Sequence, residues 1–112
     1  MQAWRVHELG EPETVLQLDD VAEATPGPDE VLVEVAAASL NFPDVLMCRG
    51  EYQVKPPLPF TPGAEVSGTV AGLGDGVDDS LLGQRVIAIP TFGHGGFTAR
   101  TIAPKSMVFP IP

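Results

Sequence analysis

Proline and glycine constrain the fold of this chain more than any other feature of its sequence. The 112 residues include twelve prolines and twelve glycines, scattered between short apolar runs and not gathered in one tract. These residues break or bend regular structure, so a chain punctuated in this way folds into many short elements. The 44% hydrophobic content is still that of a globular protein with a buried core. We therefore expect one β-rich domain, which also suits a chain of this length.

Several apolar runs fit short strands separated by turns. Residues 3–7 and 15–18 are expected to pair as a hairpin, and the run 30–39 is the best strand by its β-branched content. Gly68 and Gly72 interrupt the next run and predict bulges of the kind that close a barrel. Together these strands predict a small barrel or sandwich, with strands at residues 3–7, 15–18, 30–39, 65–73, 84–89 and 96–102.

One segment has the pattern of a short helix. Asn41 is a suitable cap, Pro43 fits the first turn, and Gly50 fits the C-terminal end. Cys48 on this helix is expected to be a buried small apolar residue. The apolar residues at helical spacing predict one buried face, formed by Phe42, Leu46 and Met47. The following loop, residues 53–62, carries four prolines and is excluded as a central strand.

The charge and the cysteine content exclude several classes of function. The formal net charge is −9, and residues 8–34 hold nine acidic residues with no Lys or Arg. Phosphate backbones and anionic lipids repel such a surface, so we expect neither a nucleic-acid nor a membrane partner. A single cysteine cannot form a disulfide within the chain. The first ten residues lack the apolar core of a signal peptide, and no run approaches the roughly 18 apolar residues of a membrane-spanning helix. These features predict a cytoplasmic protein.

A series of short motifs resembles one family across the whole chain. The quinone oxidoreductases of zeta-crystallin type, in the medium-chain dehydrogenase/reductase superfamily, begin with a GroES-like domain whose landmarks have this order and spacing. The resemblance implies a GroES-like, partly open β-barrel with one or two short helices. The matching motifs lie at residues 10–16 (Gly-Glu-Pro-Glu-Thr-Val-Leu), 29–33 (Asp-Glu-Val-Leu-Val), 39–44 (Ser-Leu-Asn-Phe-Pro-Asp), 49–52 (Arg-Gly-Glu-Tyr), 58–68 (with Pro-Gly-Ala-Glu at 62–65), 83–86 (Gly-Gln-Arg-Val) and 95–98 (Gly-Gly-Phe-Thr).

The residues at two of these motifs bear on zinc. Zinc-dependent relatives carry a thiolate at the helix entry and a histidine in the glycine motif, because a catalytic zinc needs about three N, S or O ligands. Here those positions hold Asn41 and Ala64, and alanine offers no ligand atom. The four closely spaced cysteines of a structural zinc lobe are also missing. We therefore expect a zinc-free protein.

The resemblance also implies a reaction and its residues. The family transfers hydride from NADPH to quinones or α,β-unsaturated carbonyls, in a cleft between two domains. Asn41 and Tyr52 are the implied catalytic residues, and Asn41, Asp44 and Tyr52 are the implied cofactor contacts, with Asp44 supporting the helix entry. A purely structural role remains open for each of two residues: Asn41 as a simple helix cap and Tyr52 as a packing residue. Glu65 is assigned to structure, and His94 and His7 to the solvated surface.

The motifs match only the first part of such an enzyme. No glycine-rich phosphate loop with a strand before it and a helix after it occurs here, so the nucleotide-binding Rossmann domain is absent from residues 1–112. We expect this chain alone to be inactive, and the full-length enzyme to be a homodimer. An apolar face that normally meets the missing domain is expected around Phe42, Phe60 and Phe92.

Two other functions remain open. An enoyl-thioester reductase of the same superfamily is the nearest alternative, because specificity depends on cleft residues outside this chain. A non-enzymatic oligomeric module is the other, since the same barrel also serves co-chaperonins. The proline-rich loop at residues 53–62 is stiff for the mobile loop that a co-chaperonin needs.

Overall fold

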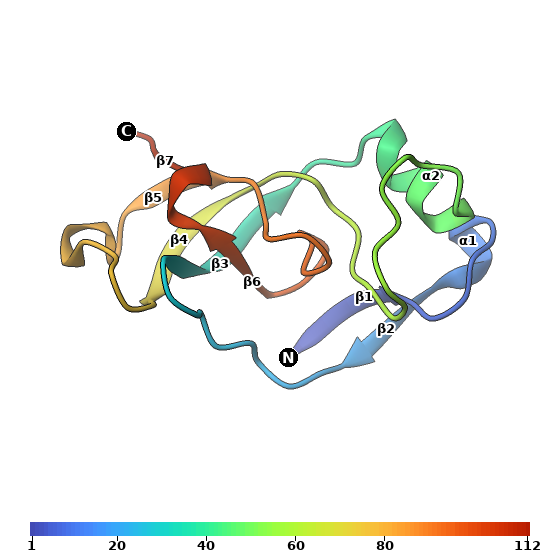
Figure 1. Cartoon of the computed structure of the whole chain (residues 1–112), viewed down its shortest axis with the longest axis horizontal. Helices are drawn as coiled ribbons and strands as arrows, with labels where there is room; N and C mark the ends of the chain where they lie inside the picture. The colour runs from blue at the N-terminus through green and yellow to red at the C-terminus, as the bar shows by residue number, and fades with distance from the viewer.

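Two antiparallel sheets form the domain in a computed structural model that describes residues 1–112 (Figure 1). The smaller sheet is a hairpin of β1 (Gln2–Val6) and β2 (Leu16–Asp20), as predicted. The larger sheet has the strand order β6-β3-β4-β5-β7. Its strands are β3 (Glu30–Ala38), β4 (Val66–Leu73), β5 (Arg85–Ala88), β6 (Arg100–Pro104) and β7 (Val108–Pro110). The two end strands, β6 and β7, are not paired with each other, so this sheet stays open.

The helices are few and short, which confirms a mainly β fold. The connection inside the β1–β2 hairpin contains α1 (Pro12–Val15), and α2 (Phe42–Arg49) follows β3. Two single 3₁₀ turns, Asp79–Leu81 and Lys105–Met107, lie in the later connections. Figure 1 shows α1 and α2 side by side at one end of the molecule, with the five-stranded sheet toward the other. No helix of the structure has the length and apolar character that crossing a membrane requires.

The two predicted glycine bulges lie where β4 pairs with β3. The register shifts after Leu32 opposite Gly72, and again after Val35 opposite Gly68. At Gly68 an added Cβ would overlap the carbonyl oxygen of Glu34 on the neighbouring strand, so only glycine allows this close approach. The bulges curve the long central strands around the core.

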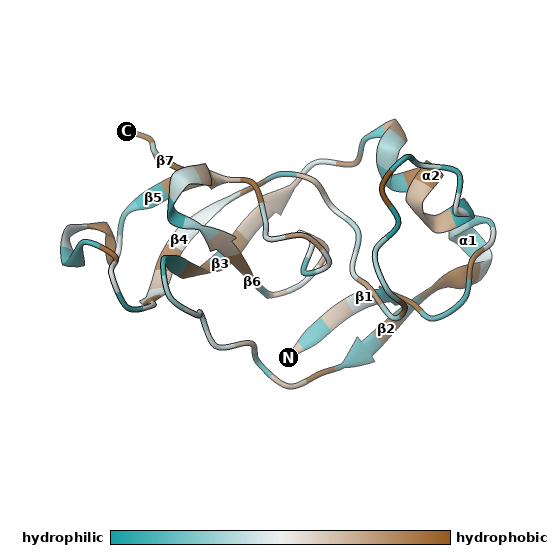
Figure 2. Ribbon diagram, in the orientation of Figure 1, coloured by the Kyte–Doolittle hydropathy of each residue, from teal (hydrophilic) through white to brown (hydrophobic).

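The core consists of two clusters of buried side chains. The larger one lies on one face of the five-stranded sheet and contains Val31, Val33, Val66, Val70, Val86, Ala88, Ala103 and Val108. The smaller one joins the hairpin, both helices and the proline loop through Val6, Val15, Cys48 and Phe60. Figure 2 shows hydrophobic residues along β3 and β6 and mostly hydrophilic ones in α1.

Helix α2 begins and ends where the sequence predicts, but it buries different residues. Gly50 follows it with φ 73°, the left-handed conformation that glycine favours at this position. The predicted buried face was wrong: Phe42 is 67% exposed, and Leu46 and Met47 are half-buried. Asp44 and Cys48, one helical turn apart, are the residues that face inward.

Cys48 confirms its expected place in the core. Its side chain is buried in the smaller cluster. Burial, and in second place the negative charge of Asp44, raise the pKa of the Cys48 thiol. The thiol is therefore kept protonated and unreactive at neutral pH, as in a structural cysteine.

Two boundaries near the C-terminal end differ from the prediction. The strand expected at residues 96–102 begins only at Arg100, because residues 96–97 bond to the proline loop through Pro62. Strand β7 lies beyond the last strand that the sequence predicts, and it pairs with β5 along Val86–Ala88. Both differences depend on contacts between distant segments, which a local pattern does not contain.

Candidate functional site

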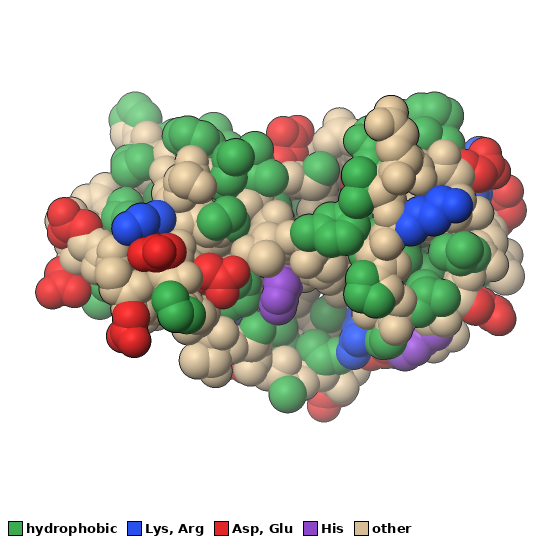
Figure 3. All heavy atoms as spheres, in the orientation of Figure 1, with side chains coloured by type: hydrophobic (Ala, Val, Ile, Leu, Met, Phe, Trp, Pro, Cys, Tyr) green, Lys and Arg blue, Asp and Glu red, His purple; other side chains and the backbone are tan.

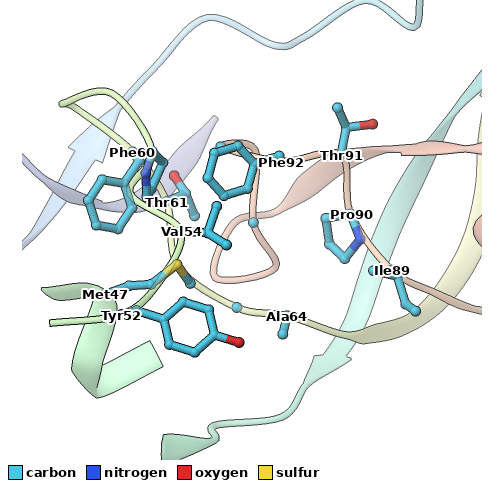
Figure 4. A pocket seen from close by; sticks show the side chains of 14 residues that line it. Met47, Tyr52, Val54, Phe60, Thr61, Ala64, Ile89, Pro90, Thr91 and Phe92 are labelled. Atoms are coloured by element: carbon cyan, nitrogen blue, oxygen red, sulfur yellow. The ribbon is translucent and has the colours of Figure 1, made fainter. Parts of the chain in front are cut away.

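A half-open pocket of ≈ 230 Å³ lies where three segments meet: α2, the proline loop and the loop after β5. Figure 4 shows its walls, with Tyr52 and Met47 on one side and Ile89, Pro90 and Phe92 on the other. Fourteen residues line it: Met47, Tyr52, Val54, Pro56, Phe60, Thr61, Gly63, Ala64, Ile89, Pro90, Thr91, Phe92, Gly93 and Gly95.

No charged side chain lines this pocket. Its side-chain polar groups are the hydroxyls of Tyr52, Thr61 and Thr91. Thr91 is already engaged, because its hydroxyl donates a hydrogen bond of 2.9 Å to the Glu30 carboxylate. Apolar walls with a few placed polar groups are typical of sites for small uncharged molecules.

Tyr52, one of the expected ligand contacts, lines this pocket. Its ring lies in the pocket wall beside Met47, and its hydroxyl points toward the side of Ala64 (Figure 4). The phenol makes none of the side-chain hydrogen bonds found within the chain, so its donor is free for a ligand.

Asn41 lies outside the pocket lining, in a small polar cluster next to it. Its side-chain amide donates to Ser39 Oγ at 3.1 Å and to Glu65 Oε1 at 3.4 Å. Ser39 also donates to the same Glu65 oxygen at 2.8 Å. Glu65 therefore has the structural role expected of it, holding the residues at the start of α2. Glu65 follows Ala64, which lines the pocket, so the cluster adjoins the pocket.

Asp44 is a buried residue that joins two backbone segments beneath this site. It is 1% exposed, and both carboxylate oxygens accept backbone hydrogen bonds, Oδ2 from Asn41 N–H at 2.9 Å and Oδ1 from Gly63 N–H at 3.0 Å. One side chain thus joins the entry of α2 to the floor of the pocket. Placed in this way, Asp44 positions other groups and does not reach the pocket surface.

The floor of the pocket is a close crossing of two backbone segments. The Pro62 carbonyl accepts hydrogen bonds from Gly96 N–H at 3.0 Å and Phe97 N–H at 3.1 Å. An added Cβ at Gly63 would lie 2.6 Å from Gly96 N, and one at Gly95 would overlap the Thr61 carbonyl oxygen. Glycines at these positions let the two backbones touch, which fixes the shape of the pocket.

The expected exposed aromatic face is only partly present. Phe42 and Phe92 are exposed, but Phe60 was predicted wrongly because it is only 2% exposed. Phe60 forms an isolated bridge with Val6, so the hairpin covers it. In Figure 3 hydrophobic side chains gather on the α2 side and along the upper edge of the five-stranded sheet, and acidic side chains outline both ends.

The chain is similar to known proteins along its whole length. A family model described as the alcohol dehydrogenase GroES-like domain matches residues 27–112. The chain belongs to this family. This GroES-like domain is 48% identical over 85 residues to quinone oxidoreductase-like protein 2 of Mus musculus, covering 76% of the chain and 23% of that protein. It is 35% identical over 112 residues to the quinone oxidoreductase of Rattus norvegicus, covering 100% of the chain and 34% of that protein.

Solved structures agree with this assignment. A mycobacterial protein solved in complex with NADPH matches the GroES-like domain with a TM-score of 0.88 and 32% identity, covering 100% of this chain and 34% of that one. The predicted GroES-like fold and the resemblance to quinone oxidoreductases are thereby confirmed. The chain spans about a third or less of the length of these relatives.

Sequence reasoning missed part of the pocket of the GroES-like domain. Ile89 and Pro90 form one wall, and Met47 reaches the opposite one from α2. The one feature of the sequence at this wall is the Ile-Pro pair that ends the β5 run. Such a pair predicts a loop, but it does not predict the wall of a ligand pocket. His94 is exposed, as expected, and lines a different hollow beside β1.

Proposed function

We propose that this domain forms the substrate-side wall of an NADPH-dependent oxidoreductase that transfers hydride to quinones or α,β-unsaturated carbonyls. The pocket around Tyr52 carries the proposal: it is uncharged, apolar and bordered by aromatic rings, which suits a flat neutral acceptor. The similarity to quinone oxidoreductases along the whole chain supports the same reaction.

Tyr52 would act on the developing charge of the acceptor. Reduction of a conjugated carbonyl places negative charge on its oxygen, and a donor aimed at that oxygen stabilises the transition state. The free phenol of Tyr52 supplies such a donor inside the pocket. When bound, NADPH supplies the hydride. Asn41 is exposed and bonds to Glu65, the neighbour of Ala64 in the chain, which supports Asn41 as the proposed contact of the nicotinamide end.

The donor set does not fit zinc at the position where zinc-dependent relatives hold it. Ala64 has no ligand atom, and the Asn41 amide is directed to Ser39 and Glu65. No group of three or more His, Cys, Asp or Glu side chains gathers anywhere in the chain. A catalytic zinc needs about three such ligands. We therefore propose that polarisation of the acceptor relies on hydrogen bonding.

A domain exchange tests the function. Residues 1–112 replace the 112 aligned residues of the Rattus norvegicus quinone oxidoreductase, and the native enzyme serves as control. We expect the chimera to oxidise NADPH with a quinone, unaffected by a zinc chelator, and the 112-residue chain alone to show no turnover. A folded chimera that reduces 2-enoyl thioesters but no quinone would contradict the proposal and favour the enoyl-thioester reductase.

The remaining expectations stay predictions. These are a homodimeric full-length enzyme, a cytoplasmic location, and the absence of nucleic-acid and membrane partners. The acidic surface is the physical reason for the last of them.

A further inference from the structure

A second apolar hollow adjoins the pocket around Tyr52. It has a volume of ≈ 250 Å³ and is lined by Leu9, Met47, Gly50, Tyr52, Val54, Lys55, Pro56, Leu58 and Phe60. Five of these residues also line the first pocket: Met47, Tyr52, Val54, Pro56 and Phe60. The two hollows are therefore direct neighbours.

The second hollow, which we name the side groove, is apolar and largely uncovered. Lys55 is its one charged residue, and it is exposed. Leu9, Val54 and Leu58 are all large hydrophobic residues that stay about half exposed. Apolar surface gathered in this way is normally covered by a ligand or a partner, because its burial releases water.

The floor of the side groove is held by the fold. The Gly10 N–H donates a hydrogen bond of 2.8 Å to the Cys48 carbonyl, which ties the start of the hairpin connection to α2. Gly50 leaves space for Leu9, since an added Cβ there would lie 2.5 Å from Leu9 Cδ1. Leu9 therefore packs against Gly50 at a fixed place in the groove.

We infer that the side groove binds an aliphatic chain carried by the quinone, with the quinone ring in the pocket beside Tyr52. This inference rests on the proposed function and specifies its substrate class as alkyl-substituted quinones. The two hollows share Met47, Tyr52 and Val54 in their linings, so one molecule can lie across these residues and cover both. An uncharged flexible chain matches the groove, whereas a charged substituent would lose its water there.

Binding to the 112-residue chain tests this by equilibrium dialysis with two quinones. One is 2,3-dimethoxy-5,6-dimethyl-1,4-benzoquinone, and the other carries decyl in place of one methyl. Buried methylene groups each add to affinity, so the decyl compound is expected to bind roughly 30-fold more tightly. Leu9→Ser and Leu58→Ser should each reduce decyl affinity about fivefold and leave the methyl compound unchanged. Leu82→Ser is the matched control, because Leu82 is similarly exposed but lies outside both hollows.

Three outcomes would overturn the inference. The first is equal affinity for the two quinones, and the second is a decyl preference that both groove variants retain, which would show non-specific partition. The third is concentration-dependent dimerisation that Leu58→Ser abolishes, which would make the groove a contact between copies. The domain-exchanged chimera separates the two proposals. If it reduces both quinones with the same KM, only the groove fails; if it reduces neither, the proposed function fails.

Discussion

Replacing Gly95 with alanine is expected to lower the free energy of unfolding by more than about 3 kcal/mol. The new methyl group would overlap the carbonyl oxygens of Thr61 and Pro62, which are backbone atoms held in the crossing beneath the pocket. Gly95 also has φ 60°, so an alanine there adds backbone strain. Urea denaturation followed by circular dichroism measures the loss.

Gly93→Ala is the matched control for this prediction. Gly93 lies in the same loop and has φ 89°, but an added Cβ there meets nothing within 4 Å. It should therefore cost only the strain of a positive φ, about 1 kcal/mol. Equal losses in the two variants would show that the crossing of Gly95 over Thr61 does not constrain the fold.

Removing the Asp44 carboxylate is the second substitution with a large expected effect. Asp44→Ala leaves the buried backbone N–H of Gly63 and the partly buried N–H of Asn41 without their acceptor, and the loss of an acceptor costs a buried group about 1–3 kcal/mol. We expect a total loss of about 2–4 kcal/mol in the free energy of unfolding. The signals of Asn41 and Gly63 in the amide NMR spectrum should also move.

Asp44→Asn and Asp75→Ala complete this experiment. Asparagine keeps the size of the side chain but turns an NH₂ group toward one of the two N–H donors. Asp44→Asn should therefore lose most of the unfolding free energy that Asp44→Ala loses. Asp75 is exposed, and its side chain makes no hydrogen bond, so Asp75→Ala should change stability by less than about 0.5 kcal/mol. An Asp44→Asn protein as stable as the wild type would contradict the role of the Asp44 carboxylate in joining Asn41 to Gly63.

The sequence predicted those elements that depend on neighbouring residues. Strand β3 follows from its β-branched residues, and the limits of α2 follow from Asn41, Pro43 and Gly50. The bulges at Gly68 and Gly72 follow from the glycines themselves. In each case the residues that determine the conformation lie within the element.

The elements that it missed depend on long-range contacts. Phe60 is buried because the hairpin strand at Val6 pairs with it, and those two residues are far apart in the chain. Strand β6 begins late because Gly96 bonds to Pro62. A periodic pattern contains no information on such pairings, so the predicted limits failed there.

The candidate site, like the fold, was predicted only in part from the sequence. Tyr52 and Asn41 came from the motif resemblance, and the structure places Tyr52 in the pocket and Asn41 in the polar cluster beside it. The wall formed by Ile89 and Pro90 emerged only when the loop after β5 was folded against the proline loop. Tyr52 as a candidate ligand contact was thus readable from the sequence, but the shape of the pocket that it lines was not.

Tyr52→Phe in the domain-exchanged chimera tests whether the Tyr52 hydroxyl stabilises the reacting quinone. The variant keeps the ring and removes only the hydroxyl that would donate to the reduced oxygen. We expect kcat to fall roughly 10- to 100-fold with the KM for the quinone nearly unchanged, because the hydroxyl acts mainly on the transition state. An unchanged kcat would contradict the claim that the pocket around Tyr52 stabilises the reacting quinone.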